Sequence, residues 1–148
     1  MVASRAVRIS AKADYAVRAL VVLARHATLR DRPVTVDRIS REGGIPPRFL
    51  EGILAEVRRA GLVDSKRGAD GGYRLAGDPS SITVAHVLRV IDGPILQVAG
   101  RDPAEVDYPP ALSSIRDAWQ AAGDGAEAAL ARVTLGDLLR TGAPDFQI

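Results

Sequence analysis

Apolar residues recur at helical spacing through the first part of the chain, separated by short polar or glycine-containing connections. Ser10 can cap a helix that runs to about His26, because its hydroxyl can accept a hydrogen bond from a free amide of the first turn. Thr35 can cap a second, shorter helix, and Gly43-Gly44 provides the turn that ends it. The pattern therefore predicts two helices before residue 45.

A third helix is predicted to begin at Pro46 and Pro47, which suit a first helical turn because its amides are unpaired in any case. The apolar positions that follow form one helical stripe, which consists of Leu50, Ile53, Leu54 and Val57. Gly61 ends this helix, and Leu62-Val63 begins a strand. The chain can then turn at residues 70–72 into a second strand that ends at Leu75.

Two short helices joined by glycines, with the second followed by a hairpin, have the element order of a winged helix-turn-helix. In that motif the second helix of the pair enters the major groove of DNA, and the hairpin forms the wing beside it. We therefore expect residues 1–78 to form a winged helix-turn-helix DNA-binding domain.

Residues 79–148 are expected to form a helical region for dimerisation and sensing. Thr83 can cap a fourth helix, and an irregular segment follows over about residues 95–107. Pro109-Pro110 then begins a long Ala-rich helix that Gly123 and Gly125 could kink, and Thr134 caps a last short one. The fold class predicted is mostly α, with a two-stranded wing and a long C-terminal dimerisation helix.

The long helix carries an apolar stripe with no obvious partner in a small DNA-binding core. Pairing with a second copy in a homodimer is one use for such a helix, and folding back on its own core is the alternative. The candidate buried positions are Leu112, Ile115, Trp119, Ala122, Leu130 and Val133.

The net charge of +2 conceals an asymmetry between the two halves. Residues 1–78 carry fifteen basic and nine acidic side chains, whereas residues 79–148 carry five basic and nine acidic ones. The first half is therefore expected to bind a polyanion such as DNA, and an uneven surface charge without a ligand is the alternative.

The chain has no cysteine, which excludes disulfides, thiol nucleophiles and cysteine-ligated zinc or iron–sulfur centres. No apolar run approaches the roughly 20 residues that span a bilayer. Because the N-terminus also lacks a secretory cleavage pattern, we expect a cytoplasmic protein.

Catalysis and metal binding find little support in the sequence. His26 and His86 lie on different predicted helices, and no Gly-rich phosphate loop or paired nucleophile and base occurs, so no catalytic residue is predicted. Asp102, Glu105 and Asp107 could bind a hard cation, but solvated loop carboxylates are the preferred interpretation and no metal site is expected.

Side chains near the start of the third helix are the first candidates for base contacts. Arg48 and Glu51 lie one turn apart and off the apolar stripe; arginine favours guanine, and glutamate accepts from the cytosine amino group. Phe49 is expected either to contact a thymine methyl or to face the core. Arg58 and Arg59, near the other end, are predicted to be phosphate contacts or plain surface residues.

Several further residues are predicted to contact the DNA backbone. Ser10 and Lys12 could hold a phosphate at the start of the first helix through amides and charge together, and a cap alone is the alternative role for Ser10. Thr35, at the start of the second helix, and Lys66, at the tip of the wing, complete this set.

Three stretches resemble the Rrf2 family of bacterial transcription regulators. They are RISAKADYAVRALVVLA from Arg8, residues 34–93, and VTLGDLL from Val133. The run RGADGGYRL, Arg67 to Leu75, followed by SSITV, is a specific part of the match. The resemblance is close over residues 8 to about 93 and looser beyond.

The resemblance implies a dimer whose winged domains bind DNA and whose long C-terminal helices cross. Arg67 matches the family position that reaches into the minor groove, and Gly68, Gly71 and Gly72 would let the wing backbone approach the sugar-phosphate chain. Cluster-binding members place three cysteines after the fourth helix, whereas this chain has none there. No iron–sulfur cluster is therefore expected as a cofactor.

The sequence thus predicts a homodimeric, sequence-specific transcription regulator, most simply a repressor, that binds a palindromic operator in double-stranded DNA. It names neither the effector nor the operator. The alternative function is a winged-helix protein-interaction module without sequence-specific DNA binding, which a gel-shift experiment would separate from the first.

Overall fold

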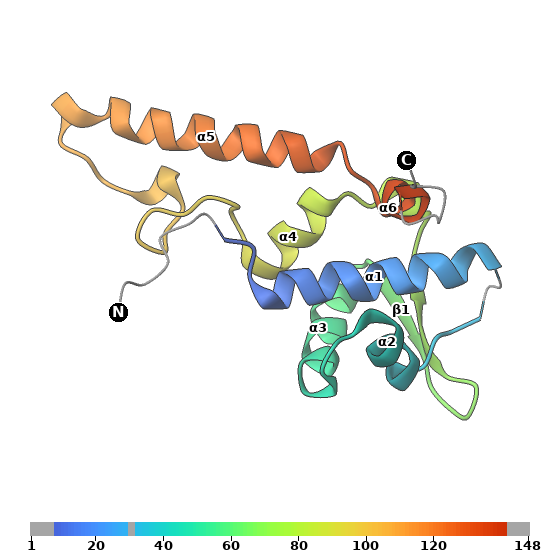
Figure 1. The fold of residues 1–148 in the computed structure, drawn as a ribbon. Helices are drawn as coiled ribbons and strands as arrows, with labels where there is room; N and C mark the ends of the chain where they lie inside the picture. The colour runs from blue at the N-terminus through green and yellow to red at the C-terminus, as the bar shows by residue number, and fades with distance from the viewer. Residues whose placement is uncertain (1–7, 30–31, 142–148) are drawn as a thin grey trace.

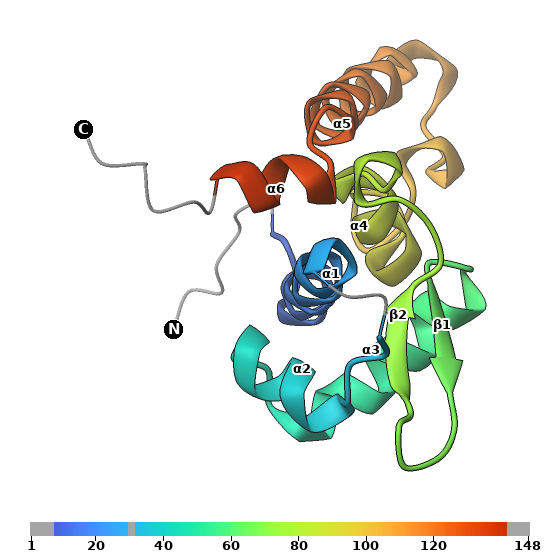
Figure 2. The same ribbon diagram turned by 90° about the vertical axis from the view of Figure 1, so that its right-hand side faces the viewer.

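The computed structural model describes residues 8–29 and 32–141. Helix α1 (Ala11–Leu29) lies at the centre, with α2 and α3 packed on one side and α4 and α6 on the other, as Figures 1 and 2 show. Both predicted regions reach beyond the described residues, at positions 1–7 and 142–148. The helix predicted to end near residue 26 continues to Leu29.

The helix-turn-helix forms where the local sequence signals place it. α2 (Val36–Gly43) begins after Thr35, whose hydroxyl accepts a hydrogen bond from the Arg38 amide at 3.2 Å. Gly44 has φ 62°, the left-handed conformation that ends a helix most easily at glycine. α3 (Pro47–Arg59) follows directly and begins on the predicted prolines.

The wing is an antiparallel pair of short strands, β1 (Val63–Lys66) and β2 (Gly72–Leu75). Val63 pairs with Leu75 at the base of the hairpin, and Lys66 pairs with Gly72 near its tip. The connection between α1 and α2 adds a further bridge, because the Val34 and Tyr73 backbones exchange two hydrogen bonds of 2.7 and 2.8 Å. The wing is therefore attached to the helix-turn-helix by backbone pairing.

The second half of the chain returns to the same core. α4 (Val84–Asp92) is capped by Thr83 and α6 (Leu135–Thr141) begins after Thr134, and these two capping residues form an antiparallel bridge. A short 3-10 turn, η1 (Pro79–Ser81), precedes α4. The Leu135 side chain is fully buried within the hydrophobic cluster of α1, α2 and α3, so residues from both predicted regions share one core.

The long helix α5 (Ser114–Ala131) begins later than expected. Pro109-Pro110 leads into a 3-10 turn, η3 (Pro110–Leu112), whose closing bonds run to the carbonyls of the two prolines. Leu112 therefore lies before α5, and Val133 lies after it, where its carbonyl accepts from the Val84 amide. The helix is continuous through Gly123 and Gly125.

α5 extends away from the core along the top of the molecule (Figure 1). It packs against α4, where Arg89 forms a two-pronged ion pair with Glu127 at 2.6 and 2.9 Å. None of the side chains of Ser114–Ala131 is buried in the single chain. Trp119 is 42% exposed and Leu112, in η3, is 48% exposed, and their predicted role in dimerisation stays a prediction.

Candidate DNA-binding surface

Helix α3 divides cleanly into an inner and an outer face. Its predicted apolar stripe is buried: Leu50, Ile53, Leu54 and Val57 are each no more than 1% exposed. Arg48 and Glu51 lie on the exposed face, at the end of the helix that follows the glycine turn. Arg58 and Arg59 are exposed at the opposite end. The outer face of α3 thus offers side chains of both charges to a ligand.

The structure decides against one of the two roles predicted for Phe49, a ring that faces the core. Its ring does not join the core, because 42% of the residue is exposed. It stacks instead on Tyr15 of α1 and lies under the guanidinium of Arg48. The predicted contact with a thymine methyl stays a prediction.

The wing tip lies on the same side of the molecule as α2 and α3, and α5 lies on the opposite side (Figures 1 and 2). Lys66 and Arg67 are exposed at this tip, and Gly68 has φ 107°, a conformation that side chains rarely adopt. Most of the predicted DNA contacts lie on one surface, which we call the lower face. It consists of the outer face of α3, the start of α2 and the wing tip.

At two positions of the wing, the fold itself requires glycine. A Cβ on Gly71 would lie 2.3 Å from the Lys66 carbonyl oxygen, and a Cβ on Gly72 would lie 2.3 Å from the Val34 carbonyl oxygen. Side chains at these positions would therefore collide with the backbone of the hairpin and of the neighbouring connection. The glycines are needed for these close backbone contacts whether or not DNA is present.

Ser10 and Lys12, the predicted phosphate site, contact carboxylates of the protein. The Ser10 hydroxyl accepts from the Ala13 amide at 3.0 Å and donates to Asp92 at 2.7 Å, which joins the start of α1 to the end of α4. The Lys12 ammonium forms an ion pair with Glu56 of α3. Ser10 thus caps α1 as expected, and a phosphate at this place stays a prediction.

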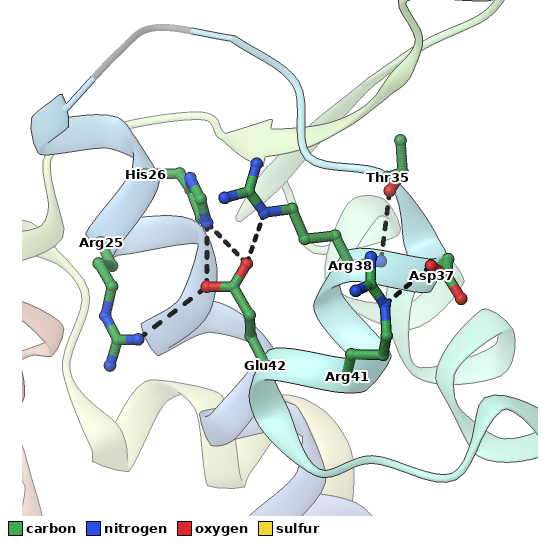
Figure 3. Close-up of polar contacts among 7 residues, drawn as sticks. All are labelled: Arg25, His26, Thr35, Asp37, Arg38, Arg41 and Glu42. Atoms are coloured by element: carbon green, nitrogen blue, oxygen red, sulfur yellow. Dashed lines mark hydrogen bonds and ion pairs between the residues drawn. The ribbon is translucent and has the colours of Figure 1, made fainter.

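A polar cluster around Glu42 holds α2 against the end of α1 (Figure 3). His26 Nε2 lies 3.0 and 3.2 Å from the two oxygens of Glu42, and Arg38 Nε donates to the same carboxylate at 2.7 Å. The guanidinium of Arg25 lies 4.0 Å away. Because Glu42 immediately precedes the glycine turn, these contacts fix the direction in which the chain enters α3.

The environment of Glu42 changes its acidity. Burial raises the pKa of this carboxyl, but hydrogen bonds and positive charge from His26 and Arg38 outweigh burial and hold the pKa below its ordinary value. The folded state therefore favours the ionised form. The stability that this contributes is present above the unfolded-state pKa, near 4.5, and is lost as the pH falls through the lower folded-state pKa.

Glu42→Gln is expected to lower the free energy of unfolding at pH 7 by about 1 kcal/mol, because it removes the charge that His26 and Arg38 share. The difference from the wild type should shrink as the pH falls below about 4.5 and through the lower folded-state pKa of Glu42, where the folded wild-type carboxylate also becomes neutral. Urea titrations at several pH values measure both effects.

Asp37→Asn is the matched control, since Asp37 and its partner Arg41 are 78% and 72% exposed. It should lose at most about 0.5 kcal/mol. An equal loss in both variants would show that the cluster around Glu42 has no special role.

Some contacts of the structure follow from sequence spacing, and others do not. The ion pairs from Arg38 to Glu42 and from Arg41 to Asp37 have the four-residue spacing that brings side chains together on a helix. The contact of His26 with Glu42, and those of Ser10 and Lys12 with Asp92 and Glu56, join different helices. No local pattern marks them.

Several polar groups of the segment between α4 and α5 form hydrogen bonds within the segment or to α5. Asp102 caps the 3-10 turn η2 (Pro103–Glu105) by accepting from the Ala104 amide at 2.9 Å. Arg101 donates to the Glu105 carbonyl at 2.6 Å, and Arg116 of α5 donates twice to the Val106 carbonyl. Within the described residues, no three histidine, aspartate or glutamate side chains gather as metal ligands do.

An iron–sulfur cluster needs soft sulfur ligands, or imidazoles in place of some of them. The sequence provides no cysteine, and the Asp102 carboxylate of this segment caps a turn. The residues present therefore do not fit a cysteine-ligated cluster. Over the described part of the chain, no helix has the length and apolar character needed to cross a bilayer.

Comparisons with known proteins agree with this architecture. The model of the Rrf2 family, described as iron-dependent transcriptional regulators, matches residues 9–141. A protein of Mycobacterium tuberculosis (strain H37Rv), provisionally named an HTH-type transcriptional regulator, is 39% identical over 138 residues, which are 93% of this chain and 84% of the relative. The HTH-type transcriptional regulator CymR of Bacillus subtilis is 34% identical over 133 residues, or 88% of each protein.

Solved structures show the same likeness. T. potens IscR superimposes with a TM-score of 0.73 at 30% identity, covering 95% of this chain and 92% of that protein. The structure of B. subtilis CymR, described as a global cysteine regulator, has a TM-score of 0.72 at 32% identity and covers 92% of this chain and 98% of its own. The relatives are named as regulators rather than enzymes. This chain belongs to the Rrf2 family and is an HTH-type transcription regulator.

Proposed function

We propose that this regulator is a homodimer that binds a palindromic operator in double-stranded DNA and represses transcription. The observation that carries the proposal is the lower face, where the outer side of α3 and the wing tip lie together. Arg48 and Glu51 are exposed there on a helix whose opposite side is fully buried. A rigid helix of this kind can present side chains to base edges in the major groove.

The remaining contacts are assigned by position. We assign Arg67 and Lys66, at the wing tip, to the minor groove and its phosphates. Thr35 precedes α2, and Arg58 and Arg59 form the C-terminal end of α3; we assign these three residues to phosphates. These residues supply position and affinity, whereas Arg48 and Glu51 supply sequence preference. A regulator that binds the chromosome acts in the cytoplasm of a bacterium, so the proposal includes that location.

The dimer is supported by the exposed apolar side of α5. Trp119 and Leu112 are large hydrophobic residues with more than two fifths of their surface exposed in the single chain. Trp119 lies on α5 and Leu112 lies in η3 just before it. Ile115 and Leu130 of α5 are half-buried, and Ala122 of α5 is exposed. Pairing of two α5 helices would cover this side and hold two α3 helices at a fixed spacing, as a palindromic site requires.

The signal that this regulator senses is proposed to be something other than a cysteine-ligated iron–sulfur cluster. The absence of cysteine from the whole sequence, and the use of Asp102 as a turn cap, support this proposal. The segment of residues 93–108 connects α4 to α5 and contacts both. An input there could change the spacing of the two α3 helices in a dimer.

Selection from a random library of duplex DNA tests the proposed function. The full-length protein should enrich a two-fold symmetric sequence and bind it at least about 1,000-fold more tightly than a scrambled duplex. If a dimer makes about eight phosphate contacts, the logarithm of the binding constant should fall with the logarithm of salt concentration with a slope near −7.

Three outcomes would contradict all or part of this proposal. Equal binding to every duplex, or no binding, would favour the alternative of a winged-helix protein-interaction module. Enrichment of an asymmetric sequence by a monomer would remove the palindrome and the dimer from the proposal. Repression itself is measured by placing the enriched sequence between a promoter and a reporter gene.

A further inference from the structure

Four side chains from α1 and α3 form a continuous series of aromatic and cationic contacts, which reaches the outer face of α3 at Arg48 and Phe49. The Tyr15 and Phe49 rings stack with their centroids 5.7 Å apart and their planes inclined by 24°. The Arg48 guanidinium carbon lies 4.7 Å from the centre of the Phe49 ring. The Arg18 guanidinium carbon lies 5.5 Å from the centre of the Tyr15 ring. We call the two stacked rings the aromatic platform.

The platform is not an ordinary part of the core. Phe49 leaves 42% of its surface exposed, although the next residue, Leu50, is completely buried. Tyr15 is partly buried and packs against the core cluster from α1. An exposed ring that touches a tyrosine on one neighbouring helix and an arginine on its own helix is well placed to restrict the arginine.

The other end of the platform is anchored to the helix-turn-helix itself. Arg18 forms an ion pair with Asp14 at 2.9 Å, and its Nη1 donates to the Gly44 carbonyl at 3.4 Å. Gly44 is the left-handed residue of the turn between α2 and α3. Tyr15 is therefore linked to the chain on both sides of the start of α3, through Arg18 to the turn and through Phe49 to the helix.

A free arginine side chain samples many rotamers. When its guanidinium binds a base, the side chain is restricted to one of them, and this loss of conformational entropy opposes binding. Stacking on Phe49 reduces this freedom before DNA arrives, and the planar guanidinium keeps its edge N–H groups available for guanine. The face of the guanidinium is then used by the ring, and the edge is used by the base.

We propose that Phe49 and Tyr15 are positioning residues that hold the Arg48 guanidinium for base readout. This inference rests on the proposed function, since it assumes that Arg48 reads a base. Phe49 then governs sequence preference through Arg48, and not through a contact of its own with a thymine methyl. Tyr15 acts one step further away by supporting the Phe49 ring from α1.

A double-mutant cycle on Arg48→Ala and Phe49→Leu tests the inference. The probes are the duplex that the wild type enriches from a random library and a scrambled duplex of equal length. Phe49→Leu alone should weaken binding to the enriched duplex about tenfold and relax the preference for guanine at one position per half-site. It should weaken binding to the scrambled duplex much less than binding to the enriched duplex, so that the ratio of the two affinities falls. In the Arg48→Ala background the same change should have no further effect.

Two further variants separate positioning from loss of structure. Phe49→Tyr keeps an aromatic ring and should restore both affinity and preference for guanine. Tyr15→Leu should reproduce part of the Phe49→Leu effect, although Tyr15 lies on another helix. Thermal unfolding is recorded for each variant, and a ring-current shift of the Arg48 δ protons in the free wild type, lost in Phe49→Leu, reports the stack directly.

The outcomes are distinguishable. If the wild type enriches a sequence but the two substitutions weaken binding independently, the positioning role is overturned and the proposed function stands. A changed preference at a thymine position, with the guanine position intact, would also overturn it in favour of a direct methyl contact. If the wild type shows no sequence preference, the proposed function itself fails, and the positioning role with it.

Discussion

Gly72→Ala is expected to lower the free energy of unfolding by about 3 kcal/mol, which corresponds to a decrease in Tm of roughly 10 °C for a chain of this size. Gly72 has φ 150°, and an added Cβ would lie 2.3 Å from the Val34 carbonyl oxygen and 3.0 Å from the Thr35 nitrogen. Backbone atoms cannot move aside as the end of a flexible side chain can. The bridge between Val34 and Tyr73 would have to open.

Gly77→Ala is the matched control for this substitution. Its added Cβ would meet nothing nearer than the Ser81 hydroxyl at 3.7 Å, and the residue does not have a positive φ. Its stability should change by no more than about 0.5 kcal/mol. Calorimetry measures the Tm of both variants. Equal Tm values would show that loss of the bridge between the wing and the connection from α1 to α2 does not destabilise the protein.

Trp119→Asp is expected to abolish the dimer and to weaken binding to a two-half-site operator at least about 100-fold. The substitution places a charge on the apolar side of α5, where the 42% exposed indole is proposed to pack against the second copy. Because each copy would then bind one half-site alone, the advantage of simultaneous binding is lost. Sedimentation should change from twice 15.7 kDa to 15.7 kDa.

Ala121→Asp introduces the same charge on another side of the same helix, at an exposed position. It should remain dimeric and bind the operator as the wild type does. The hydrogen bond from the Trp119 indole to the Tyr108 hydroxyl, at 3.2 Å, is lost only in the first variant, and Tyr108→Phe shows what that bond contributes. A Trp119→Asp protein that remains dimeric would place the dimer interface elsewhere.

The predictions that the structure confirms concern elements with local signals. Thr35 and Thr83 each cap a helix as expected, because a capping hydroxyl bonds an amide only three residues away. Gly44 ends α2 because its left-handed conformation suits glycine. Where a local signal was ambiguous, the expectation was less accurate. The prolines before α5 start a 3-10 turn, so the α-helix begins four residues later, at Ser114.

The candidate site was predicted in part for the same reason. Helical periodicity separates Arg48 and Glu51 from the buried stripe, and the hairpin signals place Lys66 and Arg67 at a turn. Periodicity cannot say which helices touch, however, and so it left two possible roles for Phe49 and could not place Tyr15 beside it. The packing of α1 against α3 is what brings those two rings together.

By itself the sequence determined the elements, their order and their inner and outer faces, because these depend on bonds and periodicities that span only a few residues. Only the tertiary structure decided that Glu42 meets His26, that Lys12 meets Glu56 and that Gly72 lies against Val34. Such contacts depend on how whole helices and strands pack. The sequence pattern of one helix or strand does not indicate where the neighbouring helix or strand lies.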